Sequence, residues 1–408
     1  MMDNDKKMVP RIRFRGFEGD WEQRKAKNIF TAISKKGNPE LPVLSVTQDE
    51  GVVPRNQLEK NINQKQSALS SYKVVTPGDF IISLRSFQGG FEETYLTGIV
   101  SPAYTVFSVL DKSNQYGEYW KSVFKRGFFI ESLKKVTFGI RDGKAISFKA
   151  FSSLPLQYPS DVEEQKKIGG IFKNLDALIA VSEKKDQQLD CLKRLFMKNI
   201  FSQEWRFEGF TDPWEQRKLG EYYYFKNGIN KGKKYFGKGI PIINYTDVFH
   251  NRSLCSKDIF GKVQVTESEQ QRFSIEVGDV LFTRTSETIT EIGYSSVVLD
   301  CSNDTIFSGF LIRGRALTQD PLDNLFKKYV FFSSNFRKEM KRKSSMTTRA
   351  LTSGAALSEM YISFPKGLSE QRQIGLIVTR LDNLIVANEK KLDQLKQLKK
   401  YLMQNMFV

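Results

Sequence analysis

Four short stretches of the chain contain residue types and spacings that could do chemistry. Residues 232–239, GKKYFGKG, imitate the phosphate loop of nucleotide-binding enzymes, but Gly239 stands where that loop needs a serine or threonine to reach magnesium. The stretch is basic and glycine-rich, and no helical pattern follows it. We therefore interpret it as a loop that could contact a phosphate, and not as an ATP site.

A carboxylate and a lysine, Glu164 and Lys166, offer residue types that a nuclease could use. They lie in the first turn of a predicted helix and recur only as Glu370 and Arg372. Negative side chains are favourable at a helix N-terminus. A charge pattern at the start of a helix is therefore the better interpretation.

The sequence lacks the residues needed for methyl transfer to a base amine and for histidine-based catalysis. Only residues 101–104, SPAY, and 212–214, DPW, come near the Asp/Asn-Pro-Pro-aromatic motif of amine methylation, and neither has a double proline. The single histidine, His250, cannot build a catalytic triad or a metal cluster twice, so we place it on a surface loop. We predict a chain that is not an enzyme, with no catalytic residue, no metal site and no cofactor of its own.

The composition is that of a globular protein with an unusually basic charge. The 408 residues carry 63 Lys+Arg against 46 Asp+Glu, a formal net charge of +17. This charge predicts a polyanionic partner, with nucleic acid favoured over a basic surface that serves only solubility. Three scattered cysteines suggest a reduced compartment and no disulfide framework. No apolar run suits a membrane span or a secretory signal, so the expected location is the cytoplasm.

Two segments of the sequence each occur twice. Residues 13–25, RFRGFEGDWEQRK, and 206–218, RFEGFTDPWEQRK, are identical at nine of thirteen positions, at an offset of 193. Residues 159–201 and 365–407 match at 20 of 43 positions without gaps, at an offset of 206. The order is therefore short phrase, variable block and long segment, and then the same order again. The variable blocks are residues 26–158 and 219–364.

Both long segments are predicted to be helices of the coiled-coil type. Their apolar residues alternate by three and four, which is the a/d pattern. The members of this predicted seam are Ile168, Ile171, Leu175, Leu178, Leu189, Leu192 and Phe196, and Ile374, Ile377, Leu381, Leu384, Leu395, Leu398 and Leu402. About 40 residues at 1.5 Å each would make a rod of roughly 60 Å. Polar residues interrupt both seams at the same place: Ser182 with Lys185, and Asn388 with Lys391. Either the two helices pair, with this polar layer fixing their register, or each lies on its own domain; we favour pairing.

The expected fold class is α+β: two mixed α/β domains joined by two long antiparallel coiled-coil helices in a pseudo-twofold repeat. A Gly-Asp turn precedes a strand-like run within residues 72–84 and again within 275–283. Short helices are predicted at 117–126 and in 325–343. The expected boundaries are 1–158 for the first domain, 159–202 for the first helix, 203–364 for the second domain and 365–408 for the second helix.

The doubled phrase ending in WEQRK, the Gly-Asp turn in each block and the doubled Pro…Glu-Gln…Ile…Leu-Asp…Ile helix together resemble one known family. The chain is similar to the DNA-specificity subunit of Type I restriction-modification systems, over all 408 residues. The resemblance implies that each block is a target-recognition domain, which reads one half of a split sequence in double-stranded DNA. It implies that the long helices form the spacer between the two readers.

The resemblance also implies the partners: two methyltransferase (modification) subunits and two restriction-translocase subunits. S-adenosylmethionine, ATP and magnesium would then belong to those partners and not to this chain. Two basic modules on a stiff rod would read sites about one helical turn, near 34 Å, apart. In this arrangement the doubled phrase anchors each block to the rod, with Phe17, Trp21, Phe210 and Trp214 as packing residues.

The residues expected to contact DNA are polar or basic and lie on predicted loops, mostly after the Gly-Asp strands. In the first block they are Arg85, Ser86, Gln88, Tyr104, Arg141 and Lys144, and in the second Lys233, Lys234, Arg284, Thr285, Ser286, Arg313 and Arg349. The basic run at 338–343 follows the backbone in one interpretation and is an exposed helix end in the other. Two other functions stay open: a helical scaffold that binds DNA without sequence preference, and a stand-alone modifying enzyme, which the missing motifs disfavour.

Overall fold

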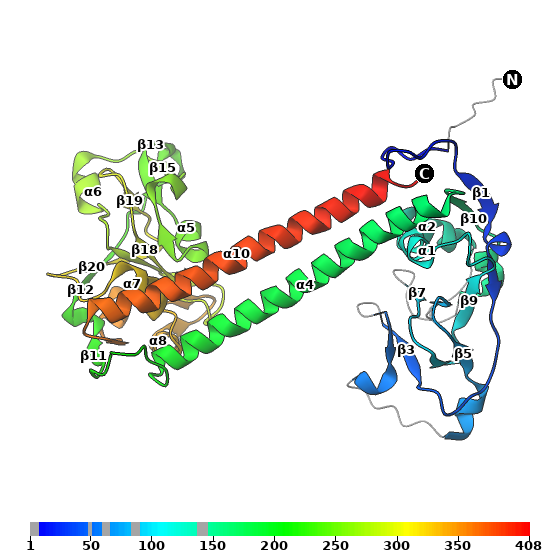
Figure 1. Ribbon diagram of the computed structural model, residues 1–408. Coiled ribbons are helices and arrows are strands. Elements are labelled where there is room, and N and C mark those ends of the chain that lie inside the picture. The colour runs from blue at the N-terminus through cyan, green and yellow to red at the C-terminus, as the bar shows by residue number, and fades with distance from the viewer. Residues whose placement is uncertain (1–7, 48–50, 59–65, 83–89, 137–145) are drawn as a thin grey trace. The chain divides into compact units, whose positions relative to one another are not determined.

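The computed structural model describes residues 8–47, 51–58, 66–82, 90–136 and 146–408. The chain forms two compact units, residues 1–183 with 390–408, and residues 184–389. Each unit therefore contains one variable block and parts of both long helices (Figure 1). In the described part of the chain, no helix is both long enough and apolar enough to cross a membrane.

The long helices are α4 (Val162–Phe201) and α10 (Leu368–Asn405). The first block contains β1 (Glu22–Lys25), β2 (Phe30–Ala32), β3 (Leu44–Val46), β4 (Val52–Pro54), β5 (Lys73–Val75), β6 (Phe80–Ile82), β7 (Phe91–Glu93), β8 (Gly98–Val100), β9 (Thr105–Val109), α1 (Gly117–Phe124), α2 (Gly127–Val136), α3 (Phe148–Ser152) and β10 (Pro155–Tyr158). The second contains β11 (Glu215–Lys218), β12 (Tyr223–Asn227), β13 (Phe236–Ile243), α5 (Tyr245–His250), β14 (Ser253–Leu254), β15 (Lys262–Val263), α6 (Glu267–Arg272), β16 (Val280–Thr283), β17 (Thr285–Ser286), β18 (Ser295–Val298), β19 (Ile306–Phe307), β20 (Leu311–Ala316), α7 (Asn324–Val330), α8 (Ser334–Lys343), β21 (Ser345–Met346), β22 (Ala350–Leu351), α9 (Gly354–Ser358) and β23 (Tyr361–Phe364).

Each block contains its own central sheet, and the two sheets have the same strand order although the sequences differ. The strand order is β2-β9-β6-β7 in the first block and β12-β20-β16-β18 in the second, where β14 adds a fifth strand. The smaller sheets differ: β3-β4 and β5-β8 in the first block, and β15-β13-β19 and β17-β22-β21 in the second. The mixed helix and strand content confirms the α+β class, and the divergence is concentrated outside the shared sheet.

The predicted Gly-Asp turn opens the equivalent central strand in both blocks. Gly78 and Gly278 have φ of 89° and 96°, a left-handed conformation that glycine adopts without strain. The next residue closes the turn, because Asp79 accepts a hydrogen bond from the Thr76 amide at 2.7 Å and Asp279 accepts one from the Glu276 amide at 2.8 Å. Strands β6 and β16 follow directly. The predicted helix within 325–343 is two helices, α7 and α8, because the Ser333 side chain caps a new helix start.

Helices α4 and α10 pair antiparallel within each unit (Figure 1). In the first unit, Asp176 and Glu183 of α4 pair with Lys399 and Lys396 of α10. In the second unit, Lys193 pairs with Asp382, and the Asn388 amide donates to Asp186 at 3.3 Å. In both units the partner number falls as the α4 number rises, which is the antiparallel arrangement.

The buried seam differs from the predicted seam at every second position from Leu178 onward in α4 and from Leu384 onward in α10. Leu175, Ser182, Leu189 and Phe196 are buried or half-buried as expected, but Leu178, Lys185 and Leu192 are exposed. Ile179, Asp186 and Lys193 occupy the helix-facing side instead. The second helix repeats this, with Ile385 buried and Leu384 exposed. An apolar pattern misses this phase because Asp186 and Lys193 are charged, and their partners lie on the other helix.

The doubled phrase anchors each block to the helix that follows it. The Arg13 guanidinium donates from Nε and Nη2 to the two oxygens of Glu164, both at 2.8 Å. Arg206 makes the same bidentate pair with Glu370, at 3.0 and 2.7 Å. Both carboxylates are buried, with side-chain exposures of 1% and 4%. Glu164 and Glu370 are therefore more than a charge pattern at a helix start, because each holds an arginine more than 150 residues away in sequence.

The neighbouring glutamine and the EQRK strand complete the anchor in both copies. Gln165 donates to the Pro159 carbonyl at 2.9 Å, and Gln371 donates to the Pro365 carbonyl at 2.8 Å. Strand β1 pairs antiparallel with β10, and β11 pairs with β23 in the equivalent register. Each phrase is thus hydrogen-bonded, as an antiparallel strand, to the strand that leads directly into the long helix.

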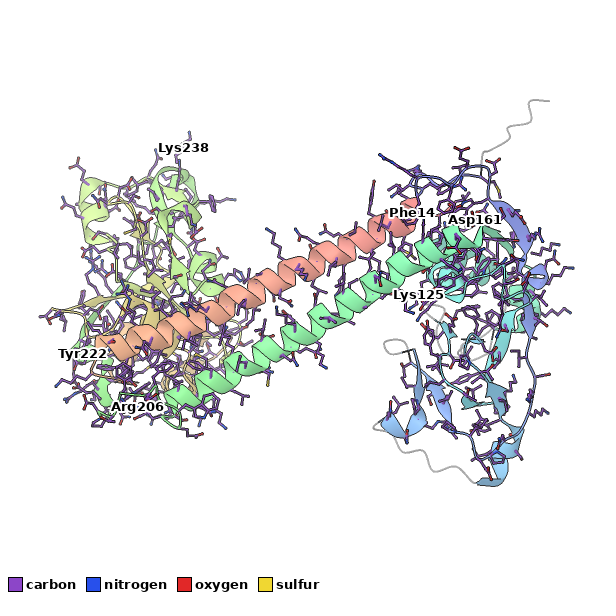
Figure 2. All side chains as sticks on the ribbon, viewed as in Figure 1. Phe14, Lys125, Asp161, Arg206, Tyr222 and Lys238 are labelled. Atoms are coloured by element: carbon purple, nitrogen blue, oxygen red, sulfur yellow. The ribbon has the colours of Figure 1, made fainter. Side chains whose placement is uncertain are left out.

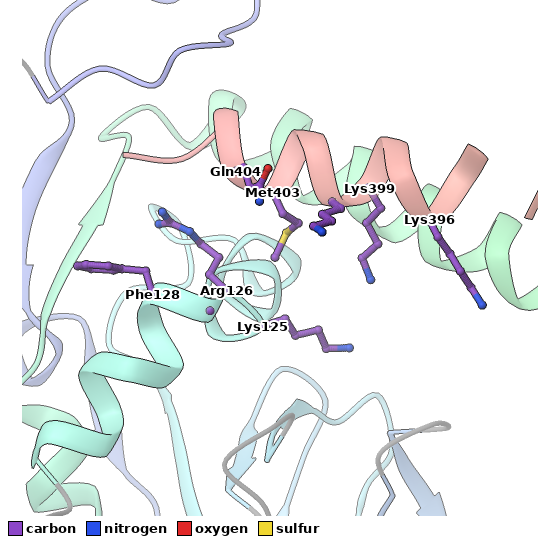
Figure 3. A pocket seen from close by; sticks show the side chains of 9 residues that line it. Lys125, Arg126, Phe128, Lys396, Lys399, Met403 and Gln404 are labelled. Carbon is purple, nitrogen blue, oxygen red and sulfur yellow. The ribbon is translucent and has the colours of Figure 1, made fainter. Parts of the chain in front are cut away.

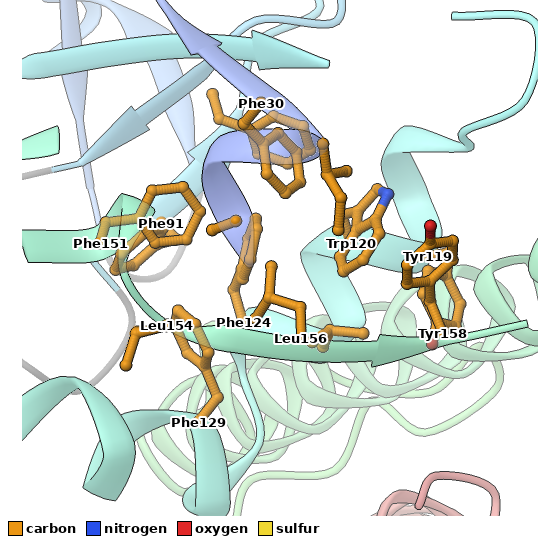
Figure 4. Close-up of a cluster of buried hydrophobic side chains, with 14 of the residues drawn as sticks. Phe30, Phe91, Tyr119, Trp120, Phe124, Phe129, Phe151, Leu154, Leu156 and Tyr158 are labelled. Carbon is orange, nitrogen blue, oxygen red and sulfur yellow. The ribbon is translucent and has the colours of Figure 1, made fainter. Parts of the chain in front are cut away.

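Aromatic residues form the core of the first block (Figure 4). Phe30 packs on Phe107 and Trp120 with ring centroids 5.3 and 5.1 Å apart. The end of α10 joins this core, since Phe407 lies edge-on to Trp21 of the first phrase at 6.3 Å. The second unit repeats the contact, with Phe201 edge-on to Trp214 at 6.1 Å. The phrase tryptophans are packing residues.

A glycine in each long helix permits its close approach to the block. A Cβ on Gly169 would lie 2.7 Å from the Tyr119 amide nitrogen of α1, and one on Gly375 would lie 2.5 Å from the Leu325 carbonyl carbon of α7. No atom would come within 4 Å of a Cβ on the adjacent Gly170. Helix propensity alone would treat all of these glycines as weakening the helix. The structure shows that Gly169 and Gly375 permit the helix to pack closely against the block.

Candidate nucleic-acid interface

Four of the residues predicted to contact DNA meet in one small ribbon of the second block. Strand β17, which contains Thr285 and Ser286, pairs antiparallel with β22, and β22 pairs with β21. The Arg284 carbonyl accepts from the Thr352 amide at 3.1 Å. Arg349 lies in the turn between β21 and β22 and pairs with Glu287 at 3.1 Å. The ribbon is a direct continuation of central strand β16, so the Gly-Asp turn positions it.

The turn of this ribbon is its exposed part. Thr347, Thr348 and Arg349 are all exposed, and the Thr347 amide donates to the Arg349 carbonyl at 3.2 Å. The Arg349 side chain is 62% exposed, so its pair with Glu287 is a surface pair of small energetic weight. Its guanidinium therefore remains available to a phosphate or a base edge. Sequence reasoning missed the two threonines, although the polar residues 347–349, TTR, between two short strands are typical of a hairpin turn.

A column of aromatic rings supports the ribbon from within the block. The Tyr245 phenol hydrogen-bonds Ser286, and its ring stacks on Phe249, with centroids 5.5 Å apart. Phe249 stacks on Tyr294 at 5.3 Å, and Tyr294 lies against Phe332. Stacked aromatic residues bury large areas with few rotatable bonds, so this column is a rigid support.

Two arginines flank the aromatic column. The Arg252 guanidinium lies 3.3 Å from the Phe332 ring centroid, and Arg337 lies 5.0 Å from that of Tyr294. Burial lowers the pKa of both guanidinium groups, that of Arg337 to about 10. Arg337 also donates to the Ile292 carbonyl at 2.6 Å. These cations are therefore structural, and no local sequence pattern predicts that they are partly buried.

The basic stretch at 232–239 is exposed but is not a simple loop. Lys233 and Lys234 lie in a 3₁₀ turn, and strand β13 follows with a bulge opposite Val263. Gly239 has a φ of 98°, and a Cβ there would lie 2.3 Å from the Val263 carbonyl oxygen. Figure 2 shows Lys238 at the tip of the layer formed by β13 and β15. The lysines thus project from a bulged strand, and no helix N-terminus is present to hold a nucleotide phosphate.

Arg313 is buried in the central sheet of the second block. It is 5% exposed, its guanidinium donates to the Ser274 carbonyl, and it lies 5.6 Å from the Phe307 ring centroid. Burial lowers the pKa of this group. The prediction placed Arg313 on a DNA-contacting loop, but it lies on β20 and faces the core, so we assign it no DNA contact.

Few of the first-block predictions fall on described residues. Tyr104 is half-buried against an apolar cluster, and its carbonyl accepts a hydrogen bond from Lys73. Arg85, Ser86, Gln88, Arg141 and Lys144 lie outside the described residues. Within the described ranges, the predicted residues therefore come together as a candidate DNA surface in the second block.

The basic run 338–343 lies in the last two turns of α8. Arg342 pairs with Glu339, and Lys343 donates to the Glu359 carbonyl at 2.7 Å. Lys338 and Lys341 are exposed, without an ion pair among the described residues. The run is thus an exposed helix end that leads into β21 and the ribbon.

Comparison with known proteins identifies the repeated unit. The family model for the Type I restriction modification DNA specificity domain matches residues 18–190 and again residues 211–397. The chain belongs to this family. Its two specificity domains coincide with the two copies of phrase, block and helix that the sequence repeats.

The chain is also similar to individual proteins. The chain is 24% identical over 277 residues to the Type I restriction enzyme MjaVIII specificity subunit of Methanocaldococcus jannaschii. The match covers 62% of this chain and spans about 61% of the length of that relative. Among solved structures, the Type-I restriction-modification system S subunit from M. genitalium matches with a TM-score of 0.61 at 14% identity, covering 98% of this chain and 99% of the other. The HsdS subunit from Thermoanaerobacter tengcongensis matches at a TM-score of 0.45 and 14% identity, covering 95% and 96%.

Proposed function

We propose that this chain is the DNA-specificity subunit of a Type I restriction-modification complex, which reads a two-part duplex target. One recognition domain, residues 1–158, reads one half of the target, and the other, residues 203–364, reads the second half. The long helices, 159–202 and 365–408, are the spacer. Catalysis, with S-adenosylmethionine, ATP and magnesium, belongs to methyltransferase and restriction-translocase partners, two of each.

The observation that carries this proposal is a shared scaffold with a divergent periphery. Both blocks keep the same four-strand order, the same Gly-Asp turn and the same arginine–glutamate anchor. They differ in the small sheets around the core, and the ribbon β17-β22-β21 is one of these. Two modules with equal frames and unequal surfaces are suited to reading two different half-sites.

Exposed leucines on the long helices support the docking of two copies of one partner. Leu178 and Leu384 are equivalent under the 206-residue offset and are 47% and 49% exposed. Leu192 and Leu398 are also equivalent and are 47% and 46% exposed. Large apolar residues repeated on solvent-facing helix surfaces are typical of interaction sites. A duplicated surface of this kind fits two identical partner chains.

The test is selection from a random duplex library by the full chain together with its methyltransferase subunit. We expect the retained DNA to share a split motif with a fixed gap. Replacing residues 26–158 with the block of a relative should change one half of the motif only. Retention without any enriched sequence would support the non-specific scaffold instead, and a change in both halves would contradict separate readers.

A further inference from the structure

Each unit contains the same groove, at the junction of a block with the end of a long helix. In the first unit a cavity of about 610 Å³ lies between the turn joining α1 to α2 and the C-terminal part of α10. In the second unit a cavity of about 520 Å³ lies between the turn joining α7 to α8 and the C-terminal part of α4. We call these two cavities the terminal grooves.

The terminal grooves are equivalent in residue position as well as in place. The five α10 residues that line the first and the five α4 residues that line the second correspond one to one at the 206-residue offset. The pairs are Lys396 with Asp190, Lys399 with Lys193, Lys400 with Arg194, Met403 with Met197, and Gln404 with Lys198. The repeat has therefore kept a concave surface, with a cation at two of the five helix positions in both grooves and methionine at a third. Fewer than half of the aligned helix residues are identical, and the acidic Asp190 stands where the first groove has Lys396.

Each groove combines an apolar wall with several cations, some of which have no ion pair within the described ranges. Methionine lines each groove, and Phe128, which is 68% exposed, lines the first. Figure 3 shows Lys125, Lys396 and Lys399 extending from the two walls of the first groove. Each of these lysines already has a carboxylate partner, which is Glu92, Glu183 and Asp176 in that order. Lys400 and Arg194 are exposed, and neither has an ion pair or hydrogen bond within the described ranges. An apolar wall with a cationic rim fits a peptide segment with apolar anchors and carboxylates, and methionine adapts its shape to such anchors.

The terminal grooves are distinct from the exposed leucines of the same helices. At about 100° per residue, Leu398 projects roughly 170° away from the direction shared by Lys400 and Met403. The same relation holds for Leu192 relative to Arg194 and Met197, since the offset is constant. A partner that covers the leucines would thus need a second segment to reach the groove.

We propose that each terminal groove binds one acidic, apolar-anchored segment, the same segment from each of two copies of one partner chain. The identification of that chain as the methyltransferase subunit rests on the proposed function. Because the two grooves occupy equivalent positions in the repeated units, we expect them to bind the same segment. The cations at the rim favour a negatively charged segment. A DNA phosphate backbone would use the cations but would leave the methionine and phenylalanine walls without a partner.

The experiment uses the full chain, its methyltransferase subunit, and two charge reversals, Arg194→Glu and Lys400→Glu. Arg194→Gln and Lys400→Gln are the milder companions, and Lys112→Glu and Lys257→Glu are controls at exposed lysines outside both grooves. Native mass spectrometry gives the number of methyltransferase copies, and titration calorimetry gives the Kd of each site. We expect each reversal to weaken one of two sites at least tenfold, the double reversal to weaken both, and the controls to bind like the wild type.

Each other outcome has a defined meaning. Two sites of unchanged Kd in the double reversal overturn the groove proposal while leaving the proposed function intact. Failure of the wild-type chain to bind any methyltransferase overturns the proposed function itself, and the groove's partner with it. If the double reversal binds the methyltransferase normally but loses salt-dependent affinity for a duplex, the grooves are phosphate sites and the proposal is wrong.

Discussion

Arg13 and Glu164 form a bidentate ion pair that joins the first residues of the doubled phrase to the start of α4. Hydrogen bonding to Glu164 raises the pKa of Arg13, and the carboxylate is almost fully buried. Arg206 and Glu370 repeat the arrangement in the second copy. Because two copies with divergent blocks retain it, this pair is part of the shared frame and not of the surface proposed to read DNA.

Removing the arginine of this pair should destabilise the first unit strongly. Arg13→Ala leaves the Glu164 carboxylate buried without its partner, a type of change that costs about 3–5 kcal/mol. We expect hydrogen exchange to accelerate in β1 and the first turns of α4, measured by mass spectrometry. Lys166→Ala, which breaks the exposed pair of Lys166 with Glu163, is the control and should leave stability almost unchanged. Equal effects of the two substitutions would contradict the anchor role.

Two adjacent glycines in α4 should respond oppositely to alanine. Gly169→Ala forces a Cβ against the α1 backbone, and we expect a loss of about 2 kcal/mol or more in the free energy of unfolding of the first unit. Gly170→Ala has open space and should stabilise the helix by up to about 1 kcal/mol. Denaturant titration followed by tryptophan fluorescence measures both. Stabilisation by both substitutions would show that the close approach is not required.

Glu93 should make the first unit less stable as the pH rises from about 4.5 to 7. Burial, followed by repulsion from Glu118, raises the Glu93 pKa from 4.5 to about 7, against the opposing effects of Lys121, Tyr95 and Lys173. Between these values the unfolded chain loses the proton while the folded chain keeps it, so stability falls with rising pH, by about 3 kcal/mol in total.

The matched variant for this titration is Glu93→Gln, which keeps the shape of the side chain and cannot ionise. Thermal unfolding from pH 4.5 to 8 should show Tm falling with pH in the wild type more steeply than in the variant. Below pH 4.5 the two proteins should differ little, since Glu93 is protonated in both the folded and unfolded wild type. Parallel curves across the whole range would show that burial does not hold the Glu93 proton.

The frame of this protein could be predicted from the sequence, because it is built from repeated and periodic residues. The doubled phrase, the Gly-Asp turn and the two helices all lie where the pattern puts them. The role of Glu164 could not be read in this way, since its partner Arg13 is distant in sequence and only the fold brings them together. The predicted helix–helix seam was wrong by one position at Leu178 and Leu192. An apolar pattern could not show this, because the charged residues Asp186 and Lys193 make contacts to the other helix.

The residues of the candidate DNA surface were less predictable from the sequence than those of the frame. Strand β20 looks amphipathic in sequence, yet Arg313 faces the core because a backbone carbonyl and an aromatic ring receive its charge. Arg284, Thr285 and Ser286 were predicted because they follow the Gly-Asp strand, although Ser286 is buried. Arg349 joins them through a strand pairing that no local signal specifies. The local sequence pattern thus predicts part of the candidate surface. The rest of it is added by the pairing of β17 with β22, two strands some sixty residues apart in sequence.

Arg349 in the exposed turn of the ribbon should matter for DNA and not for stability. Its pair with Glu287 is a surface pair, so Arg349→Ala should leave the free energy of unfolding within about 1 kcal/mol of the wild type. The loss of one guanidinium contact to a base edge should weaken binding to the selected duplex by about tenfold and relax the preference in one half-site. Arg217→Ala is matched to it, because Arg217 is an exposed arginine of the same unit in a surface pair with Glu215. Fluorescence anisotropy with the full complex measures both. Equal weakening on all duplexes would place Arg349 on the phosphate backbone, and no weakening relative to Arg217→Ala would remove the ribbon from the interface.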